Sequence, residues 1–148
     1  MAMTDLIPLV VVLGPTAVGK TGLGIHLAQS LSGEIVSADS RQVYRGMSIG
    51  TAKPDSDQRA AAPHHLIDTH DPDQTLNLSE FKALASAAIG SIHARGRLPL
   101  LVGGTGQYIR ALCQGWQVPE VPPDDALRAS LEAEAQLLGY HALWDRLA

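Results

Sequence analysis

The sequence predicts an α/β protein in which helices flank a parallel sheet, and three observations lead to this prediction. Short apolar runs alternate with segments of helical periodicity along most of the chain. The first apolar run, residues 9–13, leads directly into the glycine-rich stretch 14–21, and a helical pattern follows that stretch. A second apolar run, residues 98–102, also ends in a glycine-rich turn. Strand, glycine-rich loop and helix in this order are typical of the P-loop NTPase-like fold.

The bulk composition is that of one ordinary globular domain. The 148 residues are 45% hydrophobic and 18% charged, which is enough for a hydrophobic core. No apolar run approaches the roughly 20 residues that span a bilayer, and residues 1–8 lack the pattern of a secretory signal. We therefore expect a cytoplasmic monomer without a membrane partner. The net charge of −4 does not by itself indicate a nucleic-acid partner.

The glycine-rich stretch after the first strand predicts a binding site for a di- or triphosphate. Glycine permits backbone conformations that a side chain would block, so successive N–H groups can converge on an anion. The N-terminus of the next helix adds partial positive charge. Lys20 is expected to reach the outer phosphates, and the Thr21 hydroxyl is expected to ligate Mg²⁺. The alternative is a chance glycine turn before a helix. The predicted diphosphate-binding residues are Gly14, Pro15, Thr16, Ala17, Val18, Gly19, Lys20 and Thr21.

The first helix is predicted to run to about residue 31, with Gly33 as its C-terminal stop. Its expected apolar face consists of Leu23, Leu27 and Leu31. Residues 34–37 form a short second strand, which delivers residues 38–42 to the carboxyl edge of the sheet. Open α/β sheets bind ligands at that edge, so Asp39 is expected to lie near the phosphate loop.

Residues 43–63 are predicted to be a long loop, because glycines and prolines interrupt them. Basic residues at Arg41, Arg45, Lys53 and Arg59 are opposed there only by Asp55 and Asp57, and a solvated loop is the simplest interpretation. Residues 65–68 follow as a possible third strand. The nearby histidines at positions 64, 65 and 70 match no zinc-binding spacing, so no transition metal is predicted.

The second half of the sheet is predicted from a long helix and the strand after it. Apolar residues from Phe81 to Ile92 repeat at three and four, and Asn77 or Ser79 can cap their helix. The strand at residues 98–102 ends in a turn that contains Thr105, and a short helix follows to about residue 112. Thr105 is therefore a candidate to touch the same ligand as the phosphate loop. The Mg²⁺-binding aspartate that often follows such a strand in ATPases and GTPases is absent, which counts against plain nucleotide hydrolysis.

Prolines at positions 119, 122 and 123 mark a connector out of the sheet. We expect a P-loop core at residues 1–118 and the start of a helical insertion at residues 119–148. One helix of this insertion begins at Asp124 or Asp125 and stops at Gly139, and another begins near Tyr140. The sheet looks incomplete for this fold class, which favours a truncated fragment. Cys113, the single cysteine, is expected to be a buried thiol.

Five motifs in order resemble the tRNA dimethylallyltransferase (tRNA isopentenyltransferase) family over almost all of the chain. They are residues 14–21, 37–47, 49–54, 63–68 and 101–108. The resemblance implies a P-loop fold whose ligand is dimethylallyl diphosphate rather than ATP. It also implies transfer of the five-carbon group to N6 of an adenosine beside a tRNA anticodon, with Mg²⁺ bound against the diphosphate.

The resemblance implies a role for each matched residue. Asp39 is the expected base that takes the proton of the attacking amine, and Thr105 is expected to hydrogen-bond the leaving diphosphate. A loop carboxylate and a helix cap are the respective alternatives for these two residues. The basic loop becomes a possible secondary phosphate contact. The residues expected to contact tRNA are Asp39, Ser40, Arg41, Gln42, Thr105 and Arg128. For Arg128 a solvated helical arginine is the alternative.

Three other functions stay open. A small-molecule P-loop kinase is disfavoured by the combination of Asp39 with Thr105 and by the lack of a clear arginine-rich lid. An adenylate isopentenyltransferase, which prenylates AMP, ADP or ATP, is disfavoured by the helical excursion after Pro123. The third alternative is an inactive fragment that only binds diphosphate.

Overall fold

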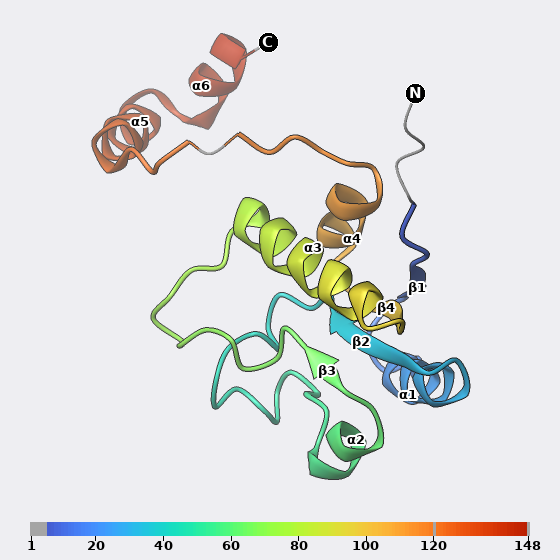
Figure 1. Ribbon diagram of the computed structural model, residues 1–148. Coiled ribbons are helices and arrows are strands. Elements are labelled where there is room, and N and C mark those ends of the chain that lie inside the picture. The colour runs from blue at the N-terminus through green and yellow to red at the C-terminus, as the bar shows by residue number, and fades with distance from the viewer. Residues whose placement is uncertain (1–5, 120, 148) are drawn as a thin grey trace, which may run out of the picture. The chain divides into compact units, whose positions relative to one another are not determined.

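Within residues 6–119 and 121–147, which the computed structural model describes, four parallel strands form one sheet in the order β1-β4-β2-β3 (Figure 1). The strands are β1 (Val10–Leu13), β2 (Gly33–Ser37), β3 (His64–His65) and β4 (Leu98–Gly103). β4 pairs with β1 in the register Val10↔Leu100 and with β2 in the register Ile35↔Leu100. The predicted parallel sheet is confirmed, and the loops that follow β1, β2 and β4 meet at one edge.

Helices cover both faces of the sheet, as predicted. α1 packs against β2 and β4 on one face, and α3 packs against the same strands on the other face, where α4 joins it (Figure 1). No helix in the described parts of the chain is long and apolar enough to cross a membrane. The helices are α1 (Lys20–Ser30), α2 (Ser56–Ala61), α3 (Leu78–Ala94), α4 (Gly106–Cys113), α5 (Asp125–Leu138) and α6 (Tyr140–Leu147).

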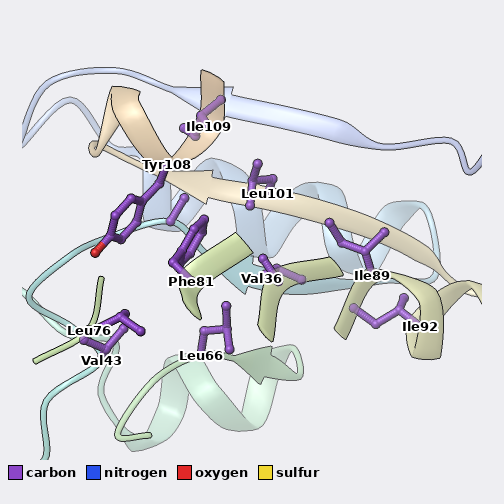
Figure 2. Packing of buried hydrophobic residues seen from close by; sticks show 12 residues of the cluster. Val36, Val43, Leu66, Leu76, Phe81, Ile89, Ile92, Leu101, Tyr108 and Ile109 are labelled. Carbon is purple, nitrogen blue, oxygen red and sulfur yellow. The ribbon is translucent and has the colours of Figure 1, made fainter. Parts of the chain in front are cut away.

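The larger core cluster lies between α3, α4 and the sheet. Phe81 of α3 stacks on Tyr108 of α4, with ring centroids 4.0 Å apart and an interplanar angle of 15° (Figure 2). Val36 and Leu101 come to the same cluster from neighbouring strands. α3 begins at Asn77, whose side chain accepts a hydrogen bond from the backbone N–H of Glu80 at 2.9 Å. The predicted apolar face of this helix is confirmed for Phe81, Ala85, Ile89 and Ile92, which are buried, whereas Leu84 is exposed.

The face of α1 that packs on the sheet differs from the predicted leucine stripe. Gly24 and Ala28 are buried, whereas Leu23 and Leu31 are about half exposed. A Cβ on Gly24 would lie 3.1 Å from Cγ2 of Val102. Small residues are therefore required where the helix approaches the sheet most closely, and larger side chains turn toward its margins.

Gly33 is the first residue of β2 and not the stop of α1, contrary to the prediction. The helix ends with Leu31 as its C-cap, and Ser32 adopts the left-handed conformation at φ 52°. A Cβ on Gly33 would lie only 2.6 Å from the carbonyl oxygen of Leu98. The missing side chain is thus required by the pairing of β2 with β4.

Two predicted strands differ from the observed ones. The continuous apolar run at residues 9–13 is typical of a strand buried on both faces, but in β1 Val11 and Leu13 are 40% and 55% exposed, because this strand lies at the sheet edge and pairs only with β4 among the described residues. The strand predicted at residues 65–68 is confined to His64–His65. Leu66 and Asp68 have φ angles of 61° and 55°, so the backbone leaves the extended conformation directly after His65.

The segment predicted to be a loop at residues 43–63 contains the short helix α2. Asp55 caps it by accepting from the Gln58 N–H at 2.8 Å, and Gln58 Oε1 accepts from the Asp55 N–H at 3.1 Å. This reciprocal pair is a capping box. The aspartate that was interpreted as a counter-charge to the basic loop is therefore the cap of a helix.

Two compact units make up the chain, Met1–Val118 and Pro119–Ala148. In the second unit Asp124 caps α5 by accepting from the Leu127 N–H at 2.8 Å, and Gly139, at φ 83°, separates α5 from α6. Arg146 of α6 binds Glu134 of α5 at 2.6 Å. In the first unit Cys113 is exposed, and the prediction of a buried thiol is wrong.

Glu34 is a buried carboxylate near the amino end of β2. Its Oε2 accepts hydrogen bonds from Nε2 of His65 and from Nη2 of Arg95, both at 2.7 Å. Burial raises the pKa of Glu34, but the hydrogen bonds and charges of His65 and Arg95 outweigh burial and hold the pKa below its usual value of 4.5. The ionised carboxylate therefore ties β2 to β3 and to the end of α3.

Acid is expected to remove the stability that Glu34 contributes. A carboxyl group whose folded pKa is lowered stabilises the fold above its usual pKa, and the contribution is lost as the pH falls through the folded value. The free energy of unfolding, measured with urea as a function of pH, should therefore drop below about pH 4.5. Glu34→Gln should flatten this drop and lower stability at neutral pH by about 1–3 kcal/mol. The exposed control Asp73→Asn should keep the original profile, whereas an unaltered drop in Glu34→Gln would contradict the assignment.

Candidate functional site

A cavity of about 510 Å³ opens at the carboxyl edge of the sheet. The phosphate loop and the start of α1 form one side, and the turn after β2 and residues 50–58 form the other. Ile35, Val102 and Gly103 line it from the sheet. The predicted site residues that line this cavity are Thr16, Ala17, Gly19, Lys20, Thr21, Asp39, Arg41 and Gln42.

The phosphate loop has the backbone shape of an anion-binding nest. Ala17 and Gly19 adopt left-handed conformations, at φ 67° and 85°. Left-handed residues alternating with right-handed ones turn successive N–H groups toward the same side. Gly19 is also the N-cap of α1, where the first helical N–H groups have no partner within the helix. Gly19 adopts the left-handed conformation without steric cost, whereas Ala17 adopts it although it has a side chain. Strained non-glycine residues of this kind cluster in functional loops.

Lys20 lies over the loop, beside the turn that follows β4. Its Nζ donates to the carbonyl oxygen of Pro15 at 2.6 Å. A Cβ on Gly104 would lie 4.0 Å from this Nζ and 3.5 Å from the carbonyl oxygen of Gly14. The ammonium group keeps two further N–H donors for an anion in the cavity.

Asp39 organises the turn that follows β2. Its Oδ1 accepts hydrogen bonds from the backbone N–H groups of Arg41 at 2.9 Å and Gln42 at 3.3 Å. Asp39 therefore has the structural role that was the alternative to a base, that of a loop carboxylate. The turn uses only one of its two oxygens. None of the described residues forms a hydrogen bond with Oδ2, and the side chain lines the cavity. One carboxylate oxygen therefore remains for a ligand.

The turns after β2 and β4 cross at close range. Ala38 donates to the Val102 carbonyl at 2.8 Å and accepts from the Thr105 N–H at 3.1 Å. A Cβ on Gly103 would lie 2.2 Å from the Ala38 oxygen, so only glycine fits there. Thr105 Oγ1 accepts from the Ser40 N–H at 3.0 Å. The crossing brings Thr105 beside the Asp39 turn.

The side-chain hydroxyl of Thr105 bonds to the turn after β2 rather than to the N–H groups of α4. It occupies the N-cap position of α4 but makes no side-chain capping hydrogen bond. Its hydroxyl does not line the cavity, and it can still donate its own proton while it accepts from Ser40. The Thr105 hydroxyl thus stabilises the turn that contains Asp39 through its hydrogen bond with Ser40.

Gln42 fastens the opposite wall of the cavity to β2. Its Oε1 accepts from the hydroxyl of Ser37 at 3.1 Å, and its Nε2 donates to the carbonyl oxygens of Thr51 and Ala52, each at 3.2 Å. Arg41 beside it is exposed and lines the cavity. The segment 50–54 is therefore part of the site, although only its motif resemblance marked it in the sequence.

His64 lines the cavity, although it was not among the predicted site residues. Its Nδ1 donates to the Ala62 carbonyl at 2.8 Å, since a carbonyl can only accept, and Nε2 is left as an acceptor. Burial lowers the pKa of His64; the Ala62 hydrogen bond opposes this, and the nearby Arg59 and His65 add to it. The register Ile35↔His64 places both side chains on the cavity face of the sheet, and this register is not visible in the sequence.

Other predicted residues lie outside the cavity lining. They are Gly14, Pro15, Val18, Ser40, Thr105 and Arg128. Arg128 belongs to α5 of the second unit, where its guanidinium lies 3.6 Å from Asp125. Its predicted contact with tRNA stays a prediction.

Thr21 fits a Mg²⁺ ion that enters together with a diphosphate. Its hydroxyl group lies in the first turn of α1 beside Lys20 and lines the cavity. Mg²⁺ takes few protein ligands in such sites and completes its shell with water and substrate phosphate oxygens. In the described part of the chain no group of three or more histidine, cysteine or acidic residues could hold a metal ion. The hard oxygen donor of Thr21 suits Mg²⁺.

Removing the Thr105 hydroxyl should loosen the crossing. Thr105→Val leaves the N–H of Ser40 without its acceptor, which should lower the free energy of unfolding by about 1–3 kcal/mol. Thr105→Ser keeps the hydroxyl group and should lose much less. Urea unfolding of both variants checks this, and equal stability of the two would show that the hydrogen bond to Ser40 contributes little.

Two family models match the chain. One, described as IPP transferase, matches residues 42–148, and another, described as isopentenyl transferase, matches residues 7–70. The tRNA dimethylallyltransferase of Roseiflexus sp. (strain RS-1) is 62% identical over 143 residues, which are 97% of this chain and 47% of that protein. The tRNA dimethylallyltransferase of Chloroflexus aggregans (strain MD-66 / DSM 9485) is 59% identical over 140 residues, covering 95% of this chain and 47% of that protein.

Solved structures have the same fold. The full-length tRNA isopentenylpyrophosphate transferase of Bacillus halodurans superposes with a TM-score of 0.75 at 46% identity, over 96% of this chain and 47% of that one. A eukaryotic dimethylallyltransferase acting on tRNA superposes with a TM-score of 0.67 at 39% identity, over 71% of this chain and 26% of that one. The chain spans about half the length of the curated relatives that it matches. On the match to residues 42–148, the chain belongs to the IPP transferase family.

Proposed function

We propose that this chain carries the transfer site of a tRNA dimethylallyltransferase. The reaction moves the five-carbon group of dimethylallyl diphosphate to N6 of an adenosine beside the tRNA anticodon and releases diphosphate. The observation that carries the proposal is the convergence at one sheet edge of the phosphate loop and the Asp39 turn, to which Thr105 is bonded. The names of the relatives support this reaction, and the proposal concerns the part of those proteins that the chain spans.

The phosphate loop holds the diphosphate as the leaving group. The nest of N–H groups, the N-terminus of α1 and the Lys20 ammonium all place positive charge where negative charge develops. Mg²⁺ held by Thr21 would neutralise part of the charge on the departing diphosphate. The Thr105 hydroxyl keeps the Asp39 turn in place by accepting from the Ser40 N–H. Because Thr105 does not line the cavity, its hydrogen bond to the diphosphate stays a prediction.

Asp39 takes the proton of the attacking amine. As N6 of the adenosine bonds to C1 of the dimethylallyl group, the bond from C1 to the diphosphate oxygen breaks and the diphosphate leaves with its electron pair. The proton of N6 passes to Oδ2 of Asp39, while Oδ1 continues to hold the turn. An exocyclic amine is a weak nucleophile, so a carboxylate at this position serves the reaction directly.

The acceptor adenosine must leave its stack to reach this cavity. Arg41, which is exposed and lines the cavity, is placed to contact an RNA phosphate or ribose at its mouth. Gln42 acts there through the wall that it fastens, since both ends of its amide are occupied. In the second unit Arg128 is the proposed additional tRNA contact.

Acceptor preference distinguishes this proposal from its rivals. Radiolabelled dimethylallyl diphosphate and Mg²⁺ are supplied with unmodified tRNA, with AMP, or without an acceptor, and the label on each is followed. The proposal expects label on tRNA alone. Label on AMP alone would indicate an adenylate isopentenyltransferase. A parallel incubation with added ATP, in which ATP is consumed without label transfer, would indicate a kinase. No label on tRNA contradicts the proposal.

Asp39→Asn should abolish transfer and spare donor binding. The asparagine oxygen can still accept from Arg41 and Gln42, so the turn should persist, but the amide cannot take a proton. We expect label transfer to fall by about 10²–10⁴-fold, with the dissociation constant for dimethylallyl diphosphate unchanged. The exposed Asp73→Asn is the control and should transfer normally. Normal transfer by Asp39→Asn would assign the base to another group, and lost donor binding would place Asp39 in the diphosphate site.

A further inference from the structure

Lys53 lies within the segment that forms one wall of the cavity, but its side chain points away from the cavity. Its neighbours Gly50, Thr51, Ala52 and Pro54 line the cavity, and Lys53 does not. The Lys53 side chain is 1% exposed, and its Nζ lies 2.5 Å from Oδ1 of Asp68 and 2.5 Å from the carbonyl oxygen of Tyr44. Lys53 is therefore unable to contact a phosphate, contrary to the role suggested for this basic loop.

Asp68 joins the two ends of the same wall. Its Oδ1 binds Lys53, and its Oδ2 binds Nη2 of Arg59 at 2.8 Å. The Nε of Arg59 donates in turn to the carbonyl oxygen of Pro54 at 2.9 Å. One carboxylate thus holds residues 53 and 59, between which Pro54 and Gln58 line the cavity.

Asp68 also connects this wall to the turn that presents Asp39. The backbone N–H of Asp68 donates to the carbonyl oxygen of Gln42 at 3.2 Å. Gln42 holds the wall through Thr51 and Ala52, and its own N–H donates to Asp39 Oδ1 at 3.3 Å. A continuous series of hydrogen bonds therefore runs from the Lys53–Asp68 pair to Asp39.

Burying the Lys53 ammonium costs free energy, and its two oxygen partners fix the direction of the side chain. A buried ammonium loses its hydration, and an apolar side chain of similar volume often serves stability as well. An apolar side chain could not bind both the Tyr44 carbonyl and Asp68. Burial raises the pKa of Asp68, but the hydrogen bonds and charges of Lys53 and Arg59 outweigh it and hold the pKa below its usual 3.8. The carboxylate is thus ionised at neutral pH, and the geometry of both partners is defined.

We infer that Lys53 and Asp68 are positioning residues of the transfer site: the ion pair of the buried Lys53 ammonium with the partly exposed Asp68 carboxylate holds the 50–58 wall and, through Gln42, the Asp39 turn. The inference rests on the proposed transfer reaction. In the described structure no hydrogen bond joins the phosphate loop to this network. The network should therefore govern how the acceptor is placed, and donor binding should not depend on it.

Lys53→Met tests the inference, and Arg45→Met is its matched control. Arg45 forms a similar ion pair with Asp71 at 2.8 Å in the same region, but both side chains are about half exposed. Lys53→Met should speed amide hydrogen exchange at residues 50–53 and 40–42 by more than about tenfold, a cost of about 1.4 kcal/mol. Transfer to tRNA should fall by a similar factor through a raised KM or a lowered kcat, while the dissociation constant for dimethylallyl diphosphate stays unchanged. Arg45→Met should match the wild type in hydrogen exchange and in the dissociation constant for dimethylallyl diphosphate. The exposed Asp73→Asn is the control for transfer to tRNA.

Asp68→Asn serves as the second variant if Lys53→Met fails to fold, because it keeps the shape and a neutral acceptor. Asp68→Asn should change hydrogen exchange and tRNA transfer in the same direction as Lys53→Met, but by a smaller factor. Wild-type exchange at residues 50–53 in a folded variant would overturn the inference. Donor binding and tRNA transfer that fall together would also overturn it, since they would indicate a general structural role. A wild-type chain that labels no tRNA contradicts the proposed function instead, and the exchange measurement still decides the role of the pair.

Discussion

The approach of two backbone segments at Gly103 is the constraint on which the site depends. The chain leaving β2 passes over the chain leaving β4 so closely that a single Cβ would lie 2.2 Å from the Ala38 oxygen. Two backbone hydrogen bonds and the Thr105 hydroxyl close this crossing. Because Gly104 lies next to Lys20 and the Gly14 carbonyl, the crossing also abuts the phosphate loop. The Asp39 turn and the phosphate loop are thereby held close to each other at one edge of the sheet.

Asp39 and Asp68 differ in how many of their carboxylate oxygens bind other residues of the fold. Asp39 uses one oxygen for its own turn and leaves the other toward the cavity. Asp68 uses both oxygens, one for each end of the cavity wall. Asp39 therefore keeps one oxygen without a hydrogen bond to any described residue, whereas protonation of Asp68 would release its basic partners. The pKa of Asp68 is lowered accordingly, so the wall stays held at neutral pH.

Much of the fold and the centre of the site could be predicted from the sequence. Parallel strands bring their carboxyl ends to one edge, so the segments after β2 and β4 had to meet there. They do, because the Thr105 hydroxyl accepts from the N–H of Ser40, the residue after Asp39. What depends on tertiary neighbours could not be predicted. The small-residue face of α1 follows from the approach of Gly24 to Val102, and the exposure of β1 follows from its place at the sheet edge. The direction of Lys53 is set by Asp68, fifteen positions along the chain, and periodicity says nothing about such a pair.

The stability of Gly103→Ala, compared with Gly104→Ala, tests most directly whether the crossing organises the site. The new methyl group at position 103 would meet the Ala38 backbone, whereas at position 104 its nearest neighbour would be 3.5 Å away. We expect urea unfolding to show a loss of at least about 1–3 kcal/mol for Gly103→Ala. For Gly104→Ala we expect a change within about 0.5 kcal/mol. Equal stability of the two variants would contradict the claim that the close passage of these segments holds the site together.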